Sequence, residues 1–169
     1  MDIFGVIKDR RSVRRFKSKS VGQDEIQRIL EAGKWAPSAG NLQAREVILV
    51  TDDRLRQEII EAALNQSFIS EAPILFVICA NRRKIGRYGE RGKYLYCIQD
   101  ASIMAQNMIL MAQSLGLGSC WVGAFEENAV RRALGIPEEI LPVAIIPVGY
   151  SNETPSTPPR DLDLHINVW

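Results

Sequence analysis

The fold of this chain is decided by the stretch DASIMAQNMILMAQSLGLGSCWVGAF, Asp100–Phe125. In its first half, small and apolar residues recur at 4-3-4-3 spacing, at Ala101, Ala105, Met108, Ala112 and Leu115. Ile98 and Ile109 lie on the other side, so a helix here is apolar nearly all round and must be buried on all sides. We therefore expect a long helix over residues 94–115, ended by Gly116, whose seam is either ordinary core or a face for self-association.

Before and after this helix, the sequence alternates between apolar runs and amphipathic segments. We expect buried strands at EVILVT (46–51), ILFVIC (74–79) and 143–149, and a short strand over 119–122. Helices are expected over residues 2–9, 23–35, 53–65 and 127–134. The basic segment 82–93 is expected to be a short excursion from the core, and 151–169 a C-terminal extension. A few apolar strands between many helices predict one layered domain over residues 1–169.

Composition and missing motifs argue against several classes of protein. The 169 residues are 46% hydrophobic and 24% charged, which indicates a globular domain, and the net charge of +1 argues against nucleic-acid binding through overall charge. Gln106 and Asn107 interrupt the longest apolar run, which argues against a membrane span. Three scattered cysteines suit a reducing cytoplasm, and the N-terminal residues do not form a signal peptide. No P-loop occurs, and GLGSCWVG (116–123) has Trp121 where the dinucleotide fingerprint requires glycine.

Side chains suited to catalysis are scarce in this sequence. His165, the one histidine, lies near the C-terminus, and nothing suggests a Ser-His-Asp arrangement or a metal site. An enzyme with so poor a set for acid–base or nucleophilic work is expected to take its chemistry from a cofactor.

The basic segment DRRSVRRFKSK (9–19) has the residue types that bind phosphate. In an extended chain Arg10, Ser12 and Arg14 project to one face, and two guanidinium groups with a hydroxyl between them match a phosphate. Arg160 could complete such a cage. A solvated basic run is the alternative.

The loop PSAGNLQ (37–43) is polar but carries no charge. Pro37 and Gly40 can fix the backbone close to a ligand, and neutral hydrogen bonds are offered by Ser38, Asn41 and Gln43. The loop therefore suits a flat ligand with a polar rim, although an ordinary polar turn is the alternative.

Four segments follow one another along the chain: RRSVRRF (10–16), PSAGNLQ (37–43), the stretch 100–125 and VGY (148–150). Together, and in this order, they resemble the FMN-dependent nitroreductase family over essentially the whole chain. The resemblance implies an α+β fold, a three-layer α-β-α sandwich with a central mixed sheet, and an intertwined homodimer with two FMN sites at its interface. It also implies an oxidoreductase in which NADH or NADPH gives hydride to flavin N5. An electron-poor acceptor, such as a nitroaromatic or a quinone, then takes the electrons in a ping-pong cycle.

The same resemblance assigns cofactor-binding positions. Phosphate and ribityl contacts fall to Arg10, Arg11, Ser12, Arg14 and Arg160. The partner's loop would meet the flavin through Pro37, Ser38, Asn41 and Gln43, and Asn65 would touch the pyrimidine edge. Backbone N–H groups near flavin N5 and O4 fall to Gly123 and Ala124, and Val122 is a further cofactor-binding position. Arg14, near N1–O2, and Gly123 would tune the flavin electrostatically, with no catalytic side chain and no metal.

Two departures from the family pattern leave details open. Ala44 and Arg45 follow Gln43 where members often have Pro-Trp, which leaves the role of Arg45 undecided. The excursion 82–93 is short, which implies an open and permissive substrate site. Two other functions stay in view, a basic module that binds nucleic acid or a phosphorylated ligand, and a flavin-binding protein without turnover. The sequence chooses neither the acceptor nor the nicotinamide, and it does not say whether the tail packs on a partner.

Overall fold

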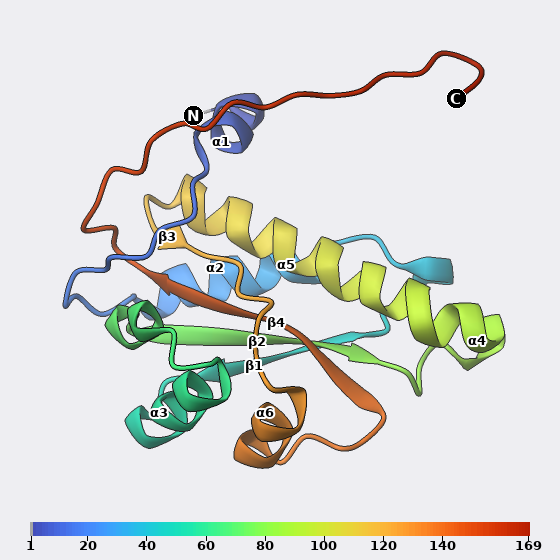
Figure 1. The fold of residues 1–169 in the computed structure, drawn as a ribbon, viewed down its shortest axis with the longest axis horizontal. Helices are drawn as coiled ribbons and strands as arrows, with labels where there is room; N and C mark the ends of the chain where they lie inside the picture. The colour runs from blue at the N-terminus through green and yellow to red at the C-terminus, as the bar shows by residue number, and fades with distance from the viewer. Residues whose placement is uncertain (1) are drawn as a thin grey trace.

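Helices cover both faces of a four-stranded sheet in the computed structural model, which describes residues 2–169 (Figure 1). The strands lie in the order β1-β2-β4-β3, with bounds β1 Arg45–Val50, β2 Ile74–Asn81, β3 Gly118–Ser119 and β4 Ile140–Gly149. Neighbouring strands are antiparallel, and Ser12 adds a parallel bridge to Ser119 that makes the sheet mixed at this edge. The strands expected from the sequence are therefore present, although β3 is shorter than expected.

The helices form two layers, one on each side of the sheet. Their bounds are α1 Ile3–Asp9, α2 Gln23–Lys34, α3 Asp53–Ala62, α4 Gly89–Arg91, α5 Cys97–Ser114 and α6 Glu127–Leu134. α2 and α5 cover one face of the sheet, and α3 and α6 cover the other (Figure 1). The three-layer α-β-α sandwich is confirmed. No helix in the described part of the chain is both long enough and apolar enough to span a bilayer.

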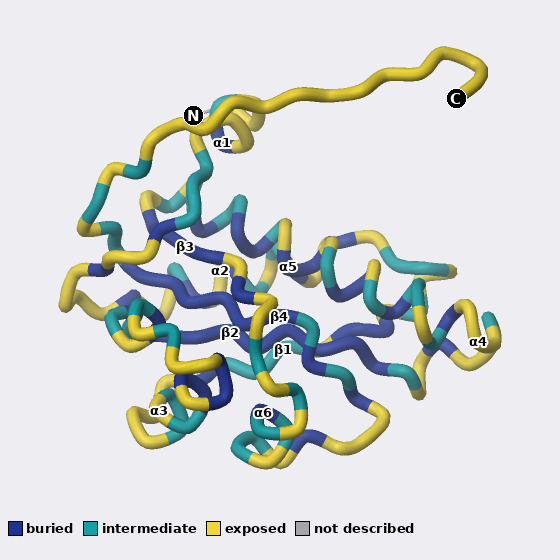
Figure 2. The backbone as a smooth tube through the Cα atoms, viewed as in Figure 1, coloured by how far each residue is buried: buried dark blue, intermediate teal, exposed yellow. Residues whose placement is uncertain are grey.

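The two apolar cores follow from the alternation of side chains along β2. Phe76 and Ile78 belong to the core under α2 and α5, whereas Leu75 and Val77 belong to the core under α3 and α6. All of β2 is buried, as its unbroken apolar run predicted (Figure 2).

Strand β1 corrects one prediction. Its apolar run predicted burial on both faces, but Glu46 is exposed and the next three residues are only half-buried. The reason is topological, because β1 is an edge strand that pairs with β2 alone.

Helix α5 is the long helix that the sequence predicted, and its seam is core. Ala101, Ala105 and Met108 are buried, and Met108 packs closely on α2 where Gly33 has no side chain. A Cβ on Gly33 would lie 2.8 Å from the Met108 Cγ. The seam therefore packs within the subunit, whereas Ile103 on another side of α5 is 40% exposed.

Both ends of the chain leave apolar side chains exposed. On α1, Ile3 and Phe4 are exposed and only Val6 is buried. Beyond Ser151 the chain runs out in an extended tail that ends far from the sheet (Figures 1 and 2). The excursion after β2 consists of short turns anchored by Ile85, which is fully buried.

Candidate functional site

The basic segment 10–16 is held in extended form beside β3. The Val13 N–H donates to the Ser119 carbonyl at 2.9 Å, and Ser12 forms the bridge to Ser119. Val13 and Phe16 are buried, which leaves Arg14 exposed between them. The segment does not alternate strictly, because Arg15 is exposed as well as Arg14 and Phe16 is buried on the side expected for Arg10, Ser12 and Arg14.

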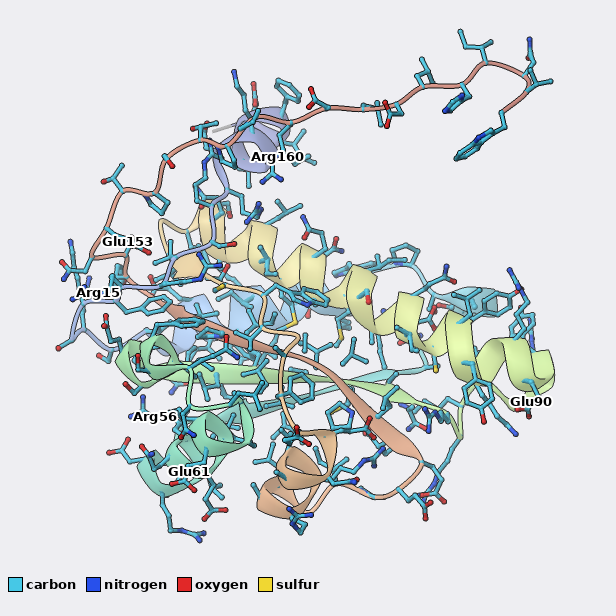
Figure 3. All side chains as sticks on the ribbon, viewed as in Figure 1. Arg15, Arg56, Glu61, Glu90, Glu153 and Arg160 are labelled. Atoms are coloured by element: carbon cyan, nitrogen blue, oxygen red, sulfur yellow. The ribbon has the colours of Figure 1, made fainter. Side chains whose placement is uncertain are left out.

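Arg160 lies with this segment although it comes from the far end of the chain. Burial lowers the pKa of Arg10 from its usual value, and repulsion by Arg160 and then by Arg11 lowers that pKa further. Figure 3 shows Arg160 beside α1, next to the start of the segment. Within residues 2–169, Arg10, Arg11, Arg14 and Arg160 form no salt bridge. Guanidinium groups gathered without an acid partner are suited to binding an anion.

Arg11 has a different task from its neighbours. Its guanidinium donates to the Lys8 carbonyl at 2.6 Å, to the Arg10 carbonyl at 2.9 Å and to the Thr157 hydroxyl. It therefore ties the C-terminal tail to the basic segment. Arg10, Ser12, Arg14 and Arg160 are the other positions at which the family resemblance predicts phosphate or ribityl contacts, and we call these four the phosphate cluster.

Two glutamates that were not predicted as site residues accept hydrogen bonds from backbone N–H groups of the basic segment. Glu153 accepts from the Arg14 N–H and, at 3.2 Å, from the Arg15 N–H. Glu71 accepts from the Phe16 N–H at 2.9 Å and pairs with the Arg15 guanidinium. Glu153 and Arg15 lie close together in Figure 3. Neither glutamate neutralises the phosphate cluster, and no local sequence pattern could have identified contacts across so many residues.

Cys120 marks the point where three members of the phosphate cluster converge. Burial raises the pKa of its thiol, and Arg14, a hydrogen bond from Ser12, and Arg10 oppose that rise in this order. The thiol stays protonated near neutral pH because burial is the larger effect. Cys120 therefore provides an uncharged wall under the cluster.

The predicted contacts at 65 and 122–124 lie beside the phosphate cluster. The Gln66 side chain donates to the Ala124 carbonyl at 2.9 Å and so joins the Asn65 turn to the segment after β3. The Arg14 guanidinium lies 5.8 Å from the Phe68 ring centroid, which links the cluster to the same turn. Asn65 has a left-handed φ of 55°, which is uncommon for a residue other than glycine.

The backbone N–H groups at 122–124 are not equivalent. The Val122 N–H donates to the Ile145 carbonyl at 3.0 Å, so Val122 positions the segment but offers no N–H to a ligand. Gly123 and Ala124 are exposed, and their N–H groups donate to no acceptor in the described part of the chain.

The loop 37–43 is strained and presents its polar side chains outward. Gly40, Asn41 and Gln43 all have a left-handed φ, between 50° and 56°. The Ser38 hydroxyl accepts from the Gln43 N–H at 3.0 Å and closes the loop, whereas the Asn41 and Gln43 side chains are exposed. Non-glycine residues in this region cost free energy, and such strain concentrates at ligand sites.

Asp100 and Arg45 fix this loop from inside the protein. The buried Asp100 carboxylate accepts from the Ala39 N–H at 2.9 Å and from the Ala44 N–H at 3.2 Å. The buried Arg45 guanidinium donates to three carbonyls at the end of α2, those of Lys34, Ala36 and Pro37. Burial lowers the pKa of Arg45, and Asp100 opposes that shift.

These contacts bear on the question that the Ala44-Arg45 departure raised. Arg45 supports the loop from behind, because its buried guanidinium donates to carbonyls next to the loop. Asp100 was missed as a site residue, although a lone carboxylate inside a helix that is apolar nearly all round was a usable signal.

The loop and the phosphate cluster lie at opposite ends of α5. The loop is bonded to Asp100 in the first turn, whereas a hollow near the last turn is lined by Val13 of the basic segment and by Gln113. At 1.5 Å per residue, the two positions on α5 are roughly 20 Å apart along the helix axis. One chain therefore does not bring all the predicted flavin contacts together.

A cavity of about 680 Å³ lies beside the loop. Its lining comes from the loop, the excursion and the first half of α5, namely Pro37, Ser38, Ala39, Tyr88, Tyr96, Ile98, Gln99, Asp100, Ser102 and Ile103. The wall is mainly aromatic and aliphatic with a few polar groups, which suits a planar organic ligand.

Comparisons with known proteins agree with one another. The profile of the Nitroreductase family matches residues 7–70 and 61–150. A protein of Methanothermobacter thermautotrophicus, provisionally named NADH dehydrogenase/NAD(P)H nitroreductase, is 32% identical over 100% of this chain and 88% of its own length. The NADPH-flavin oxidoreductase of Vibrio harveyi is 30% identical over 94% of this chain and 69% of its own. The structure of Vibrio harveyi NADPH:FMN oxidoreductase complexed with NAD+ superposes with a TM-score of 0.90, at 28% identity, over 99% of this chain and 77% of that one.

Proposed function

The chain belongs to the nitroreductase family, and from that premise we propose that it is an oxidoreductase that uses FMN to pass electrons from NADH or NADPH to electron-poor acceptors, such as nitroaromatics or quinones. The observation that carries the proposal is the phosphate cluster. Within residues 2–169, its Arg10, Arg14 and Arg160 form no salt bridge, and the neighbouring N–H groups of Gly123 and Ala124 donate to no acceptor.

The residues present fit a flavin mononucleotide. The phosphate cluster supplies charge-assisted donors for a phosphate monoester, each worth roughly 1.5–3 kcal/mol. Ser38, Asn41 and Gln43 supply neutral partners for a polar ring edge, and Gly123 and Ala124 supply N–H donors. Bound FMN would supply the hydride chemistry that the side chains lack. Arg14 would stabilise negative charge on the ring, and the Gly123 N–H would orient the reacting edge.

We infer that donor and acceptor bind in turn at the same place. The cavity beside the loop 37–43 is the described hollow that adjoins the predicted ring contacts, and its aromatic lining suits a nicotinamide as well as a quinone. If both use it, the oxidised nicotinamide must leave before the acceptor enters. Initial rates should then follow a ping-pong pattern.

A homodimer would complete the site. In a twofold dimer the loop of one copy can meet the phosphate cluster of the other, which removes the separation along α5. The extended tail supports this arrangement, because its exposed apolar residues alternate with polar ones in a way that suits packing on a second chain, at Leu162, Leu164, Ile166 and Val168. Ending the chain after Arg160 should weaken the dimer while keeping Arg160. Light scattering after size-exclusion chromatography measures this effect.

Purified protein tests the proposed function directly. We expect visible flavin absorption, release of FMN on denaturation, a dimeric mass, and oxidation of NADH or NADPH that depends on an added quinone or nitroaromatic. A colourless monomer without affinity for added FMN would contradict the proposal. Bound FMN without nicotinamide oxidation would indicate a flavin-binding protein that does not turn over.

We also propose a cytoplasmic location. The three cysteines are free and buried, which suits a reducing compartment.

A further inference from the structure

The excursion stacks arginine side chains on its own tyrosines. The Arg87 guanidinium carbon lies 4.8 Å from the Tyr88 ring centroid, and that of Arg91 lies 5.6 Å from the Tyr96 centroid. Each arginine also donates to the hydroxyl of its tyrosine, at 2.8 Å for Arg87 and 3.1 Å for Arg91. The two rings meet edge to face at 5.4 Å, so both arginines are held in one unit.

Three cations of the excursion have no carboxylate partner within residues 2–169, namely Arg87, Arg91 and Arg82, whose guanidinium carbon lies 5.5 Å from the Tyr94 ring centroid outside the cavity lining. Arg83 pairs with Glu139 at 2.8 Å, Lys84 with Glu46 at 3.4 Å and Lys93 with Glu90 at 3.0 Å. Over residues 2–169, Arg87 and Arg91 form no salt bridge.

The tyrosines place this unit at the cavity beside the loop 37–43. Tyr88 and Tyr96 both line the cavity, so each arginine is one hydrogen bond from its wall. The Arg87 guanidinium and the Tyr88 hydroxyl also pack on Gly40, where a Cβ would lie within 2.5 Å of that hydroxyl. The acid that lines the cavity, Asp100, already binds two backbone N–H groups. Two exposed guanidinium groups therefore lie next to the tyrosines of the cavity wall.

We propose that Arg87 and Arg91 form an anion-binding subsite of this cavity, which favours reaction partners whose planar ring system carries a phosphate, sulfonate or carboxylate group. The anion could belong to the electron donor, as the extra phosphate of NADPH, or to the acceptor, as a ring substituent. The inference rests on the proposed function, because it takes the cavity as the place where donor and acceptor bind. On this proposal the excursion helps to select which reaction partners bind in the cavity.

The test compares two quinones of similar shape with the FMN-loaded enzyme, menadione, which is neutral, and 1,4-naphthoquinone-2-sulfonate. In the double variant Arg87→Gln/Arg91→Gln, the KM for the sulfonate should rise about tenfold while that for menadione changes less than about twofold. A parallel comparison of NADPH with NADH, using menadione as acceptor, shows whether the donor's phosphate uses the same subsite. Arg83→Gln removes the same charge from the same segment and should leave all four KM values unchanged.

Equal effects of the double variant on charged and neutral partners would overturn the inference, as would no effect on either anion. Calorimetric titration of 1,4-naphthoquinone-2-sulfonate into the oxidised protein, without a donor, gives a second reading that needs no turnover. Wild type should bind about tenfold more tightly than the double variant, and equal affinities together with an unchanged KM for NADPH would overturn the inference. Failure of the proposed function would show differently, as absence of FMN or of nicotinamide oxidation in the wild type.

Discussion

Two arginine-rich segments look alike in sequence but are built differently, RRSVRR at 10–15 and RRKIGRYGERGK at 82–93. The first is drawn out beside β3, and its side chains meet Arg160 from the other end of the chain. The second is wound into short turns, and its arginines stack on neighbouring tyrosines. One site is assembled by the fold of the whole chain, and the other by local contacts.

The partners of each segment show why charge density alone does not identify a ligand site. At the first segment, Glu71 and Glu153 accept from backbone N–H groups and leave most of the guanidinium groups unpaired. In the second, Glu139 and Glu90 pair with exposed cations, in salt bridges that contribute little stability. The acids near the first segment are therefore engaged largely by backbone N–H groups, whereas those near the second pair with side-chain cations and leave Arg87 and Arg91 without a salt bridge over residues 2–169.

The largest expected effect separates the two segments by FMN affinity. Arg10→Ala should raise the Kd for FMN about a hundredfold, because it removes a charge-assisted contact to the phosphate. The same substitution should leave the Tm of the apoprotein unchanged or raise it, because Arg10 is repelled by Arg160 and Arg11. Fluorescence titration with FMN and thermal unfolding of the apoprotein measure the two effects.

Arg83→Ala is the matched control from the second segment. Arg83 is exposed and paired with Glu139, so its loss should change FMN affinity by less than about twofold. Equal weakening of FMN binding by both substitutions would break the distinction between the segments.

The next effect concerns the support beneath the loop 37–43. Asp100→Asn replaces one accepting oxygen by an NH2 group that faces a backbone N–H, so the apoprotein should lose about 2 kcal/mol of unfolding free energy. FMN affinity should fall as well, because the loop that carries Asn41 and Gln43 loses its anchor. Urea unfolding and FMN titration measure both quantities.

Val130→Ala provides a control of similar destabilisation in the core on the other face of the sheet. Val130 belongs to α6 and is fully buried, and its truncation should cost roughly 2 kcal/mol. FMN affinity should not change in this variant. If both variants bind FMN equally well, Asp100 supports the fold only.

A smaller effect tests the contact between the loop and the excursion. Gly40→Ala should cost about 1 kcal/mol of stability for the left-handed backbone, and it should also displace Arg87 and Tyr88. The control is Gly135→Ala at the end of α6, which has the same left-handed conformation but nothing within 4 Å of an added Cβ. Both variants should lose similar stability by urea unfolding, but only Gly40→Ala should raise the KM for an anionic quinone.

The same contrast explains how much the sequence could predict. Periodicity predicted the strand at 74–79 and the helix over 94–115, found as Ile74–Asn81 and Cys97–Ser114, because each depends on residues close in sequence. Exposure of β1 could not be predicted, because an edge strand is defined by pairings across the sheet. The phosphate cluster was predicted with Arg160 through family resemblance, whereas Glu153, Glu71 and the carbonyl contacts of Arg45 depend on distant backbone that leaves no local pattern.

The smallest expected effect compares the thiols buried beside the two segments. Burial raises the pKa of both Cys120 and Cys97, and the first opposing charge is Arg14 for Cys120 and Arg82 for Cys97. Arg14→Gln should therefore raise the pKa of Cys120 further and leave that of Cys97 alone, and Arg82→Gln should do the reverse. Peptide-resolved alkylation rates as a function of pH measure both thiols in one experiment.

The sign of the accompanying stability change is fixed by the direction of the shifts. A thiol whose pKa is higher in the folded state than the unfolded value of 9.0 binds its proton more tightly when folded. Its contribution to stability is therefore complete below about pH 9 and is lost as the pH rises through the folded pKa, by at most about 1.4 kcal/mol per pH unit. Each arginine variant should shift this alkaline loss to higher pH at its own thiol. If either substitution changes the pKa of both thiols equally, the two basic segments do not have separate local electrostatic effects. The distinction between the segments would then be wrong.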